Sequence, residues 1–332
     1  MNNVKKFVPM LVAVIIFSVA ARLLIRFVEN TFNLDIDPLV RILIIGLSVV
    51  IAISIVNVKL AKKTKEGAKN GIKISRFSLI PGLIPGIGML IVAAVPTLWI
   101  LNLGAEWSVV RLGTFAWAAS VALKIAWAVL AHKPILNFLK TKLPTKLSGP
   151  ISWSYIGLLT GIFECGIALV FVLKFNILYQ ATWIDILAFG IGFGAFEAFA
   201  VGVVSLSQIG QYLLRPESIP EKYRKEKEEE ESTLNNLSML LVGPVERVST
   251  LLIHVFSNVL IILAVQQNIY LLFWLSFGFK TLVDGIAGWL TLEKDAENVT
   301  KASQAWAHQA IFIVLGLISV AGIVLLQKIW YS

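Results

Sequence analysis

Glutamate and histidine side chains interrupt several otherwise apolar stretches of this 332-residue sequence. Four such groups lie inside or at the edge of runs of Leu, Ile, Val, Phe and Gly: Glu164, Glu197, Glu246 and His254. A charged group at the centre of a bilayer costs about 2.5–3.5 kcal/mol, so a membrane protein that keeps several of them has a use for them. Carboxylates and imidazoles take up and release protons during hydrolysis. We therefore expect a hydrolytic reaction centre inside the membrane.

The spacing around His254 places several polar residues on one side of a helix. Glu246, Thr250, His254 and Asn258 recur at every fourth position. Residues four apart lie on the same helix face, and a polar face on an apolar helix must point into the bundle. Arg247 follows Glu246 directly, and these two could instead form an ion pair at the cytoplasmic edge of the helix.

Glycines accompany the other two glutamates. The run around Glu164 contains Gly157, Gly161 and Gly166, and three more glycines at alternate positions, 190 to 194, precede Glu197. Small residues let neighbouring helices approach closely. For the second set of glycines, close helix packing and space for a substrate beside Glu197 are equally good interpretations.

A lysine and an aspartate lie in the next apolar run. Lys280 and Asp284 are four residues apart and can pair along one helix. Alternatively, Lys280 neutralises Glu197 or Glu246. We expect Glu246, Arg247, Lys280 and Asp284 to support the centre electrostatically.

The sequence does not favour a metal site or a cofactor. A catalytic zinc ion needs three protein ligands, and His254 is the one histidine expected deep inside an apolar run. The sequence also lacks an H-E-x-x-H motif, a G-x-S-x-G motif and a P-loop. We therefore expect no metal and no cofactor.

The elements that carry these residues are predicted to be membrane-spanning helices. Hydrophobic residues make up 57% of the sequence and charged residues 15%, and the apolar residues form runs long enough to cross a hydrocarbon core of about 30 Å. We predict an all-α polytopic membrane bundle of about nine spans: Phe7–Val28, Leu39–Val58, Leu79–Leu103, Trp107–Ala131, Ile151–Leu173, Trp183–Leu206, Leu237–Val265, Ile269–Leu292 and Trp306–Ile329. Residues 1–150 would form an N-terminal group of about four helices, and residues 151–332 the core, with a charged cytoplasmic loop at 214–235.

The net charge of +9 follows the positive-inside rule, so nucleic acid is not an expected partner. Basic residues cluster in the loops after the second, fourth and sixth spans, which places the N-terminus in the cytoplasm and the C-terminus outside. Prolines 81, 85 and 96 are expected to kink or interrupt the third span, and Gly243-Pro244 to start or kink the seventh. We expect an integral plasma-membrane protein in contact with the lipid bilayer. Its oligomeric state does not follow from the sequence.

Over residues 151–290 the sequence resembles the YhfC family of intramembrane peptidases in the order of these motifs. That family is related to the PrsW and CAAX-endopeptidase/Abi proteins. This group of glutamic-type intramembrane proteases carries E-E-x-x-x-R, then F-x-x-x-H or F-x-x-x-E, then H-x-x-x-N. In this sequence Glu164 opens the first motif, and Cys165 and Leu169 replace its second glutamate and its arginine. The second motif aligns as Phe189–Phe193, with Phe193 in place of the histidine, or one turn later as Phe193–Glu197. His254–Asn258 matches the third.

The resemblance implies hydrolysis of peptide bonds in membrane-embedded or membrane-associated substrates. Glu164 would activate water, Glu197 would take the place of the second-motif residue, and His254 and Asn258 would hold the oxyanion. Two alternatives stay open. One is an inactive relative that binds membrane proteins as a scaffold. The other is a proton-coupled transporter, which the sequence supports less because it shows no internal repeat.

Overall fold

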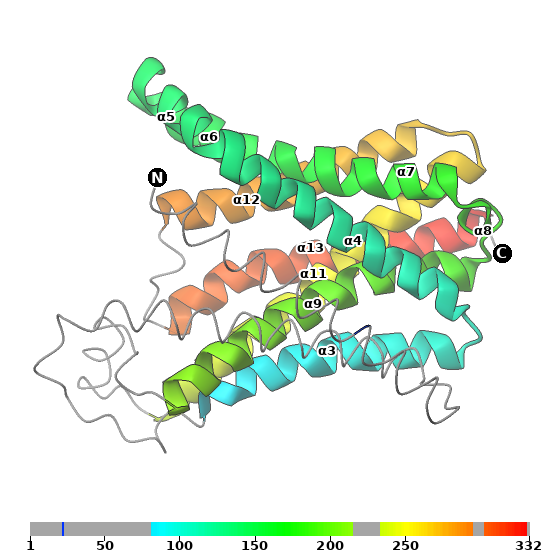
Figure 1. Ribbon diagram of the computed structural model, residues 1–332, viewed down its shortest axis with the longest axis horizontal. Helices are drawn as coiled ribbons and strands as arrows, with labels where there is room; N and C mark the ends of the chain where they lie inside the picture. Colours follow the sequence, from blue (N-terminus) through cyan, green and yellow to red (C-terminus); the bar gives the residue numbers. More distant parts are fainter. Residues whose placement is uncertain (1–21, 23–80, 215–232, 295–301, 331–332) are drawn as a thin grey trace, which may run out of the picture. The chain divides into compact units, whose positions relative to one another are not determined.

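The computed structural model describes Arg22 and residues 81–214, 233–294 and 302–330. All regular structure in these ranges is helical, as predicted (Figure 1). The α-helices are α3 (Leu83–Asn102), α4 (Trp107–Trp127), α5 (Lys133–Lys142), α6 (Thr145–Thr160), α7 (Gly166–Lys174), α8 (Asn176–Tyr179), α9 (Trp183–Leu214), α11 (Thr233–Gln266), α12 (Leu271–Glu293) and α13 (Ala302–Trp330). Two π-helical segments, η2 (Ala128–His132) and η3 (Gly161–Cys165), link α4 to α5 and α6 to α7.

Seven helical stretches of the described chain are long and apolar enough to cross a membrane. They correspond to the last seven of the nine predicted spans, with bounds that differ by a few residues at most ends. The remaining two, Phe7–Val28 and Leu39–Val58, lie outside the described residues, so the total of about nine stays a prediction. The division at residue 150 and the loop at 214–235 also stay predictions; residues 215–232 of that loop are not described.

Two prolines do not end their helices where the sequence suggested that they could. Helix α3 continues through Pro96, and α11 begins well before Gly243-Pro244 and runs through it. A proline removes one backbone hydrogen bond, but an apolar surrounding offers the other backbone groups no water, so they keep their helical partners. The basic segment after the fourth span, expected as a loop, is likewise helical as α5.

The described residues belong to two compact units. The first includes the described residues 81–87 and 200–214, and in it the start of α3 packs on the end of α9. A Cβ on Gly86 would lie 2.5 Å from Cγ of Leu206, so only glycine permits this approach. The second unit, residues 88–199 and 233–332, contains every candidate site residue.

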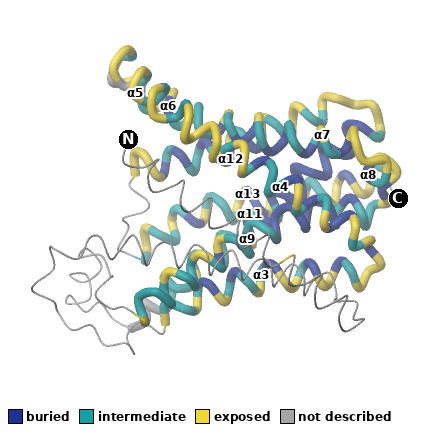
Figure 2. Tube along the Cα trace, in the orientation of Figure 1, coloured by how far each residue is buried: buried dark blue, intermediate teal, exposed yellow. Residues whose placement is uncertain are grey.

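Helix α11 is the central element of the second unit. It packs against α12 and α13, while α6 packs along α12. Within its most apolar 18-residue window 78% of residues are buried, the largest share among the seven spans, and Figure 2 colours much of it dark blue. His254 and Asn258 of the polar stripe are buried, as the spacing predicted, whereas Glu246 at its outer end is partly exposed.

The glycines before Glu197 are helix-packing residues. A Cβ on Gly190 would lie 2.7 Å from Cα of Val255 in α11, and one on Gly192 would lie 2.1 Å from the carbonyl oxygen of Val110 in α4. These contacts decide between the two interpretations left open by the sequence. They hold α9 tightly between α4 and α11, so the backbone that carries Glu197 is firmly placed.

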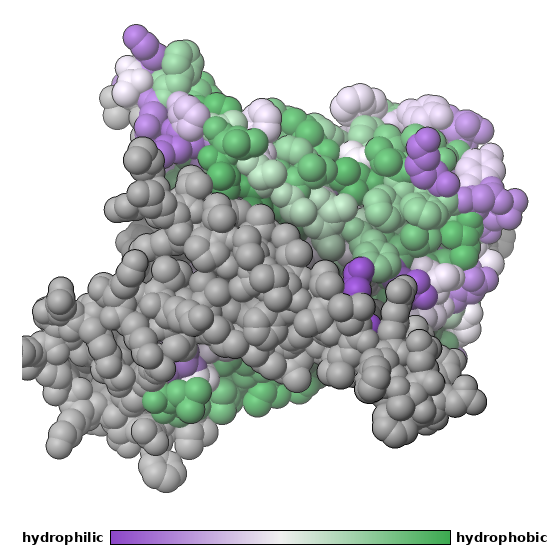
Figure 3. Space-filling model, in the orientation of Figure 1, coloured by the Kyte–Doolittle hydropathy of each residue, from purple (hydrophilic) through white to green (hydrophobic). Residues whose placement is uncertain are grey.

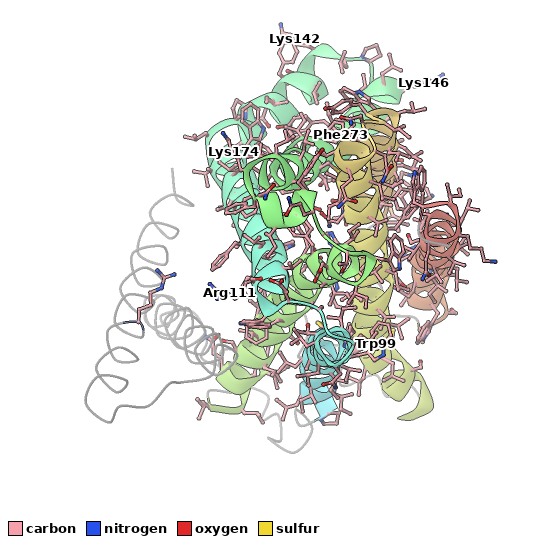
Figure 4. All side chains as sticks on the ribbon, turned by 90° about the vertical axis from the view of Figure 1, so that its right-hand side faces the viewer. Trp99, Arg111, Lys142, Lys146, Lys174 and Phe273 are labelled. Atoms are coloured by element: carbon pink, nitrogen blue, oxygen red, sulfur yellow. The ribbon has the colours of Figure 1, made fainter. Side chains whose placement is uncertain are left out.

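The outer surface has the polarity expected for contact with lipid. Figure 3 shows a broad apolar area over the described helices, with hydrophilic residues gathered toward the ends. Large apolar side chains such as Trp99, Leu130 and Trp274 are more than half exposed. Lys142 and Lys146 lie together at one end, at the turn from α5 to α6 (Figure 4), where charged residues can reach headgroups and water.

Candidate active site

Glu164 lies on the π-helical segment η3 between α6 and α7. A π-turn inserts an extra residue into the helix and is frequent at functional sites. Close packing fixes the segment, because a Cβ on Gly161 would lie 2.5 Å from Oγ1 of Thr281 in α12. Only 6% of the Glu164 side chain is exposed. The fold therefore holds this carboxylate inside the bundle.

Two lysines from different helices neutralise Glu164. Nζ of Lys124, in α4, lies 2.5 Å from Oε1, and Nζ of Lys280, in α12, lies 2.9 Å from Oε2. Lys280 is buried, whereas Lys124 is 26% exposed and lies 3.9 Å from Asp284, which is also partly exposed. Lys280 therefore pairs with Glu164, which neither sequence alternative proposed. Asp284 lies at the edge of the cluster.

His254 lies between the two intramembrane glutamates. Its Nε2 is 2.7 Å from Oε2 of Glu197, and its Nδ1 is 3.8 Å from Oε2 of Glu164 and 3.5 Å from Nζ of Lys280. The side chain is 2% exposed. An ammonium group can only donate, so this arrangement suits a neutral His254 that carries its proton on Nε2 and presents the Nδ1 lone pair to Lys280.

Glu197 collects donors from three sides. Besides His254, Nε1 of Trp117 in α4 donates to Oε2 at 3.0 Å, and Arg247 forms a short ion pair with Oε1. Arg247 also pairs with Glu246, which is 38% exposed. Glu246 and Arg247 thus form the outer part of the cluster, and Arg247 connects that part to Glu197.

Asn258 lies one helical turn beyond His254 and faces the same cavity. Its Nδ2 donates to the carbonyl oxygen of His254 at 2.8 Å, while its Oδ1 is buried without a hydrogen-bond partner. The cavity is also lined by Glu164, His254 and Lys280 and is too narrow for a water molecule in this conformation. The amide oxygen is therefore an unused acceptor, and the role of Asn258 in holding the oxyanion stays a prediction.

The positions that depart from the motifs have identifiable surroundings. Cys165 lies 3.8 Å from Oγ of Ser257 and 3.7 Å from Oγ of Ser276, and Leu169 packs against the apolar core. Phe193 places its ring 5.0 Å from that of His254. The positive charges beside Glu164 come from Lys124 in α4 and Lys280 in α12.

The described residues bring together no group of three histidine, cysteine, aspartate or glutamate side chains that could hold a metal ion. Ligands of a tetrahedral zinc ion lie about 2.1 Å from the metal and hence roughly 3.4 Å from one another. His254 and Glu197 are 2.7 Å apart, as in a direct hydrogen bond. Glu164 faces the other ring nitrogen, so one ion on His254 cannot reach both carboxylates in this arrangement.

Sequence reasoning missed two members of the cluster, Lys124 and Trp117. Lys124 is a charge inside a predicted span, so the criterion that singled out Glu164 could have found it. Trp117 carries no comparable signal, because tryptophan is frequent in membrane helices. Of the eight site residues expected from the sequence, the structure joins seven through ion pairs and hydrogen bonds and leaves Asp284 at the edge, beside Lys124.

Comparison with known proteins identifies the family of this chain. A protein-family model described as YhfC intramembrane metalloprotease matches residues 88–323, which include every residue of the cluster. No curated protein and no solved structure matches the chain. The match covers well over half of the sequence, and together with the apolar helices it makes this an integral multi-pass membrane protein. The chain belongs to the YhfC intramembrane metalloprotease family.

Proposed function

We propose that this chain hydrolyses peptide bonds of membrane-associated substrates at the centre formed by Glu164, His254 and Glu197. The observation that carries the proposal is the position of His254 between the two carboxylates, 3.8 Å from Glu164 and 2.7 Å from Glu197. Three ionisable groups on three different helices converge there inside an apolar bundle. Such a cluster is costly to keep in a membrane and is typical of a functional site.

Glu164 acts as the general base. Its carboxylate lines the cavity, where it would take a proton from a water molecule that attacks the scissile carbonyl. Asn258 contributes the buried acceptor Oδ1, which can hold the second proton of that water or the N–H of the scissile bond. Both atoms face the same small space, which supports their acting on one substrate group.

Glu197 holds His254 in position. By accepting from Nε2 it selects the neutral tautomer in which Nδ1 is an acceptor that faces Lys280. Arg247 and Trp117 fix Glu197 in turn. This ordered chain of contacts resembles the carboxylate-oriented histidine of other hydrolases, in which the carboxylate sets the orientation and tautomer of the ring.

The family description implies a metal ion, and the residues of this chain do not fit one. The carboxylates at the centre already form ion pairs with Lys124, Lys280 and Arg247. The two ring nitrogens of His254 face different glutamates, so they do not point at one common ion. We therefore route no step of the reaction through a metal.

The test is cleavage by the purified full chain in lipid nanodiscs, offered a pool of membrane-spanning peptides and followed by mass spectrometry. We expect cleavage by the wild type and none by Glu164→Gln or His254→Ala. The matched control is Glu293→Gln, because Glu293 also accepts an indole N–H, from Trp153 at 3.2 Å, but lies at the exposed end of α12. Full activity in both site variants would refute the assignment. Stable capture of peptides without cleavage would favour the scaffold alternative.

A further inference from the structure

The ammonium group of Lys280 lies within reach of both Glu164 and His254. It lies 2.9 Å from Oε2 of Glu164 and 3.5 Å from Nδ1 of His254, and its side chain lines the cavity. A metal ion bound by this carboxylate and this imidazole would have to occupy the same position. Lys280 is only 2% exposed. The fold therefore holds a positive charge at the position where a metalloprotease would hold its metal ion.

The other donors of the cavity cannot serve a developing oxyanion as well. One of the two amide N–H groups of Asn258 is bound to the carbonyl of His254, and the amide carries no charge. Lys124 reaches Glu164 from the partly exposed side, and the residues that line the cavity do not include it. Lys280 has three N–H donors, of which Glu164 and His254 can accept two.

We propose that Lys280 is a catalytic residue of this centre and supplies, in place of a metal ion, the positive charge that stabilises the oxyanion. The proposal rests on the proposed function, since it assigns the electrophile for the same hydrolysis. It departs from the metal that the family description implies. A cation held in a water-poor site can stabilise a developing negative charge strongly.

The step balances as follows. Water forms a new O–C bond with the scissile carbonyl, one of its protons passes to Glu164, and the carbonyl π electrons move onto the oxygen. The ammonium group of Lys280 turns from Oε2 of Glu164 toward that oxygen, which also removes a competing cation from the carboxylate as it accepts the proton. When the intermediate collapses, the C–N bond breaks and the proton on Glu164 passes to the leaving amine. Lys280 then returns to Glu164, and no oxidant or reductant is needed.

The experiment compares Lys280→Met, Lys280→Arg and wild type in the same peptide assay, with Lys174→Met as the control for loss of an exposed helix-end lysine. Removing an oxyanion donor typically lowers kcat by about 10²–10³, so we expect that loss for Lys280→Met with KM little changed. Lys280→Arg keeps the charge and should lose less. A merely structural lysine would not separate kcat from KM in this way.

Metal analysis of the purified wild type gives a readout that does not depend on turnover. We expect substoichiometric zinc, iron and other transition metals, and activity that survives strong chelators. The neutral pair Glu164→Gln with Lys280→Met provides a folding control, because it removes both charges together.

Two results would overturn the inference. One is stoichiometric metal whose removal abolishes activity and whose return restores it. The other is Lys280→Met with wild-type kcat while Glu164→Gln is inactive, which would leave the proposed function intact. A wild type that cleaves nothing, or an active Glu164→Gln, would instead refute the proposed function. If Lys280→Met does not fold, the Arg variant and the metal content still decide: an arginine variant with no activity and a metal-loaded wild type would both contradict the inference.

Discussion

Replacing Glu197 by glutamine converts one of its two oxygen acceptors into a donor at a point where three donors meet. In the wild type, Oε1 accepts from Arg247, and Oε2 accepts from His254 at 2.7 Å and from Trp117 at 3.0 Å. A glutamine has one oxygen, and hydrogen bonds from a charged donor are the stronger ones. The oxygen should therefore turn to Arg247, which leaves the amide N–H₂ facing His254 and Trp117.

This change reverses the tautomer of His254. With a donor opposite Nε2, the ring must carry its proton on Nδ1, 3.5 Å from the ammonium group of Lys280, where two donors then face each other. In serine proteases the corresponding amide substitution lowers kcat by about 10⁴ through the wrong tautomer. We expect a loss of roughly 10³–10⁴ in kcat here. The buried indole N–H left without an acceptor should lower the free energy of unfolding by about 1–3 kcal/mol.

Steady-state cleavage of a quenched fluorescent membrane peptide measures the first quantity, and thermal unfolding in the same nanodiscs measures the second. Glu293→Gln, which changes an exposed glutamate that also accepts an indole N–H, should alter neither. A Glu197→Gln variant that folds and keeps kcat within a few-fold of the wild type would refute the role of Glu197 as the residue that orients His254.

Two further substitutions test the packing and the outer contacts of the site. Gly192→Ala should destabilise the protein by about 1–3 kcal/mol, because the new Cβ would lie 2.1 Å from the carbonyl oxygen of Val110. The control Gly166→Ala, with no atom within 4 Å of the new Cβ, should be neutral or slightly stabilising. Thermal unfolding measures both variants, and equal stability of the two would contradict the prediction. Trp117→Phe should keep an aromatic ring and lose one hydrogen bond to Glu197. The free energy of unfolding should fall by about 1 kcal/mol, and the same energy lost in the transition state would lower kcat about five-fold. An inactive but folded variant would show that Trp117 does more than position Glu197.

Much of the fold follows from the sequence, because a bilayer imposes strong constraints on it. Runs of about 20 apolar residues can only be satisfied as helices in lipid, and seven predicted spans coincide with observed helices. The course of the chain at Pro96 and Pro244 was harder to predict. A proline weakens a helix by an amount that neighbouring helices can offset, and sequence alone does not reveal those neighbours.

The candidate site was predictable in its members and less so in its pairings. Charges inside apolar runs stand out, so Glu164, Glu197 and His254 could be identified from single positions. The partner of Lys280 could not, since the spacing alone favours Asp284, four residues along the same helix, whereas the structure pairs Lys280 with Glu164 on another helix. The role of Asn258 also depended on which end of its amide the carbonyl of His254 accepts from. Such pairings depend on contacts between different helices, which leave no periodic pattern in the sequence.

Cleavage in ¹⁸O-labelled water tests most directly whether Glu164 activates water for peptide hydrolysis. The wild type in nanodiscs, given a pool of membrane peptides, should produce fragments whose new C-terminal carboxylate carries one labelled oxygen. Glu164→Gln should produce no labelled fragments, although thermal unfolding should show that the variant is folded. Labelled fragments from Glu164→Gln at the wild-type rate would contradict the account.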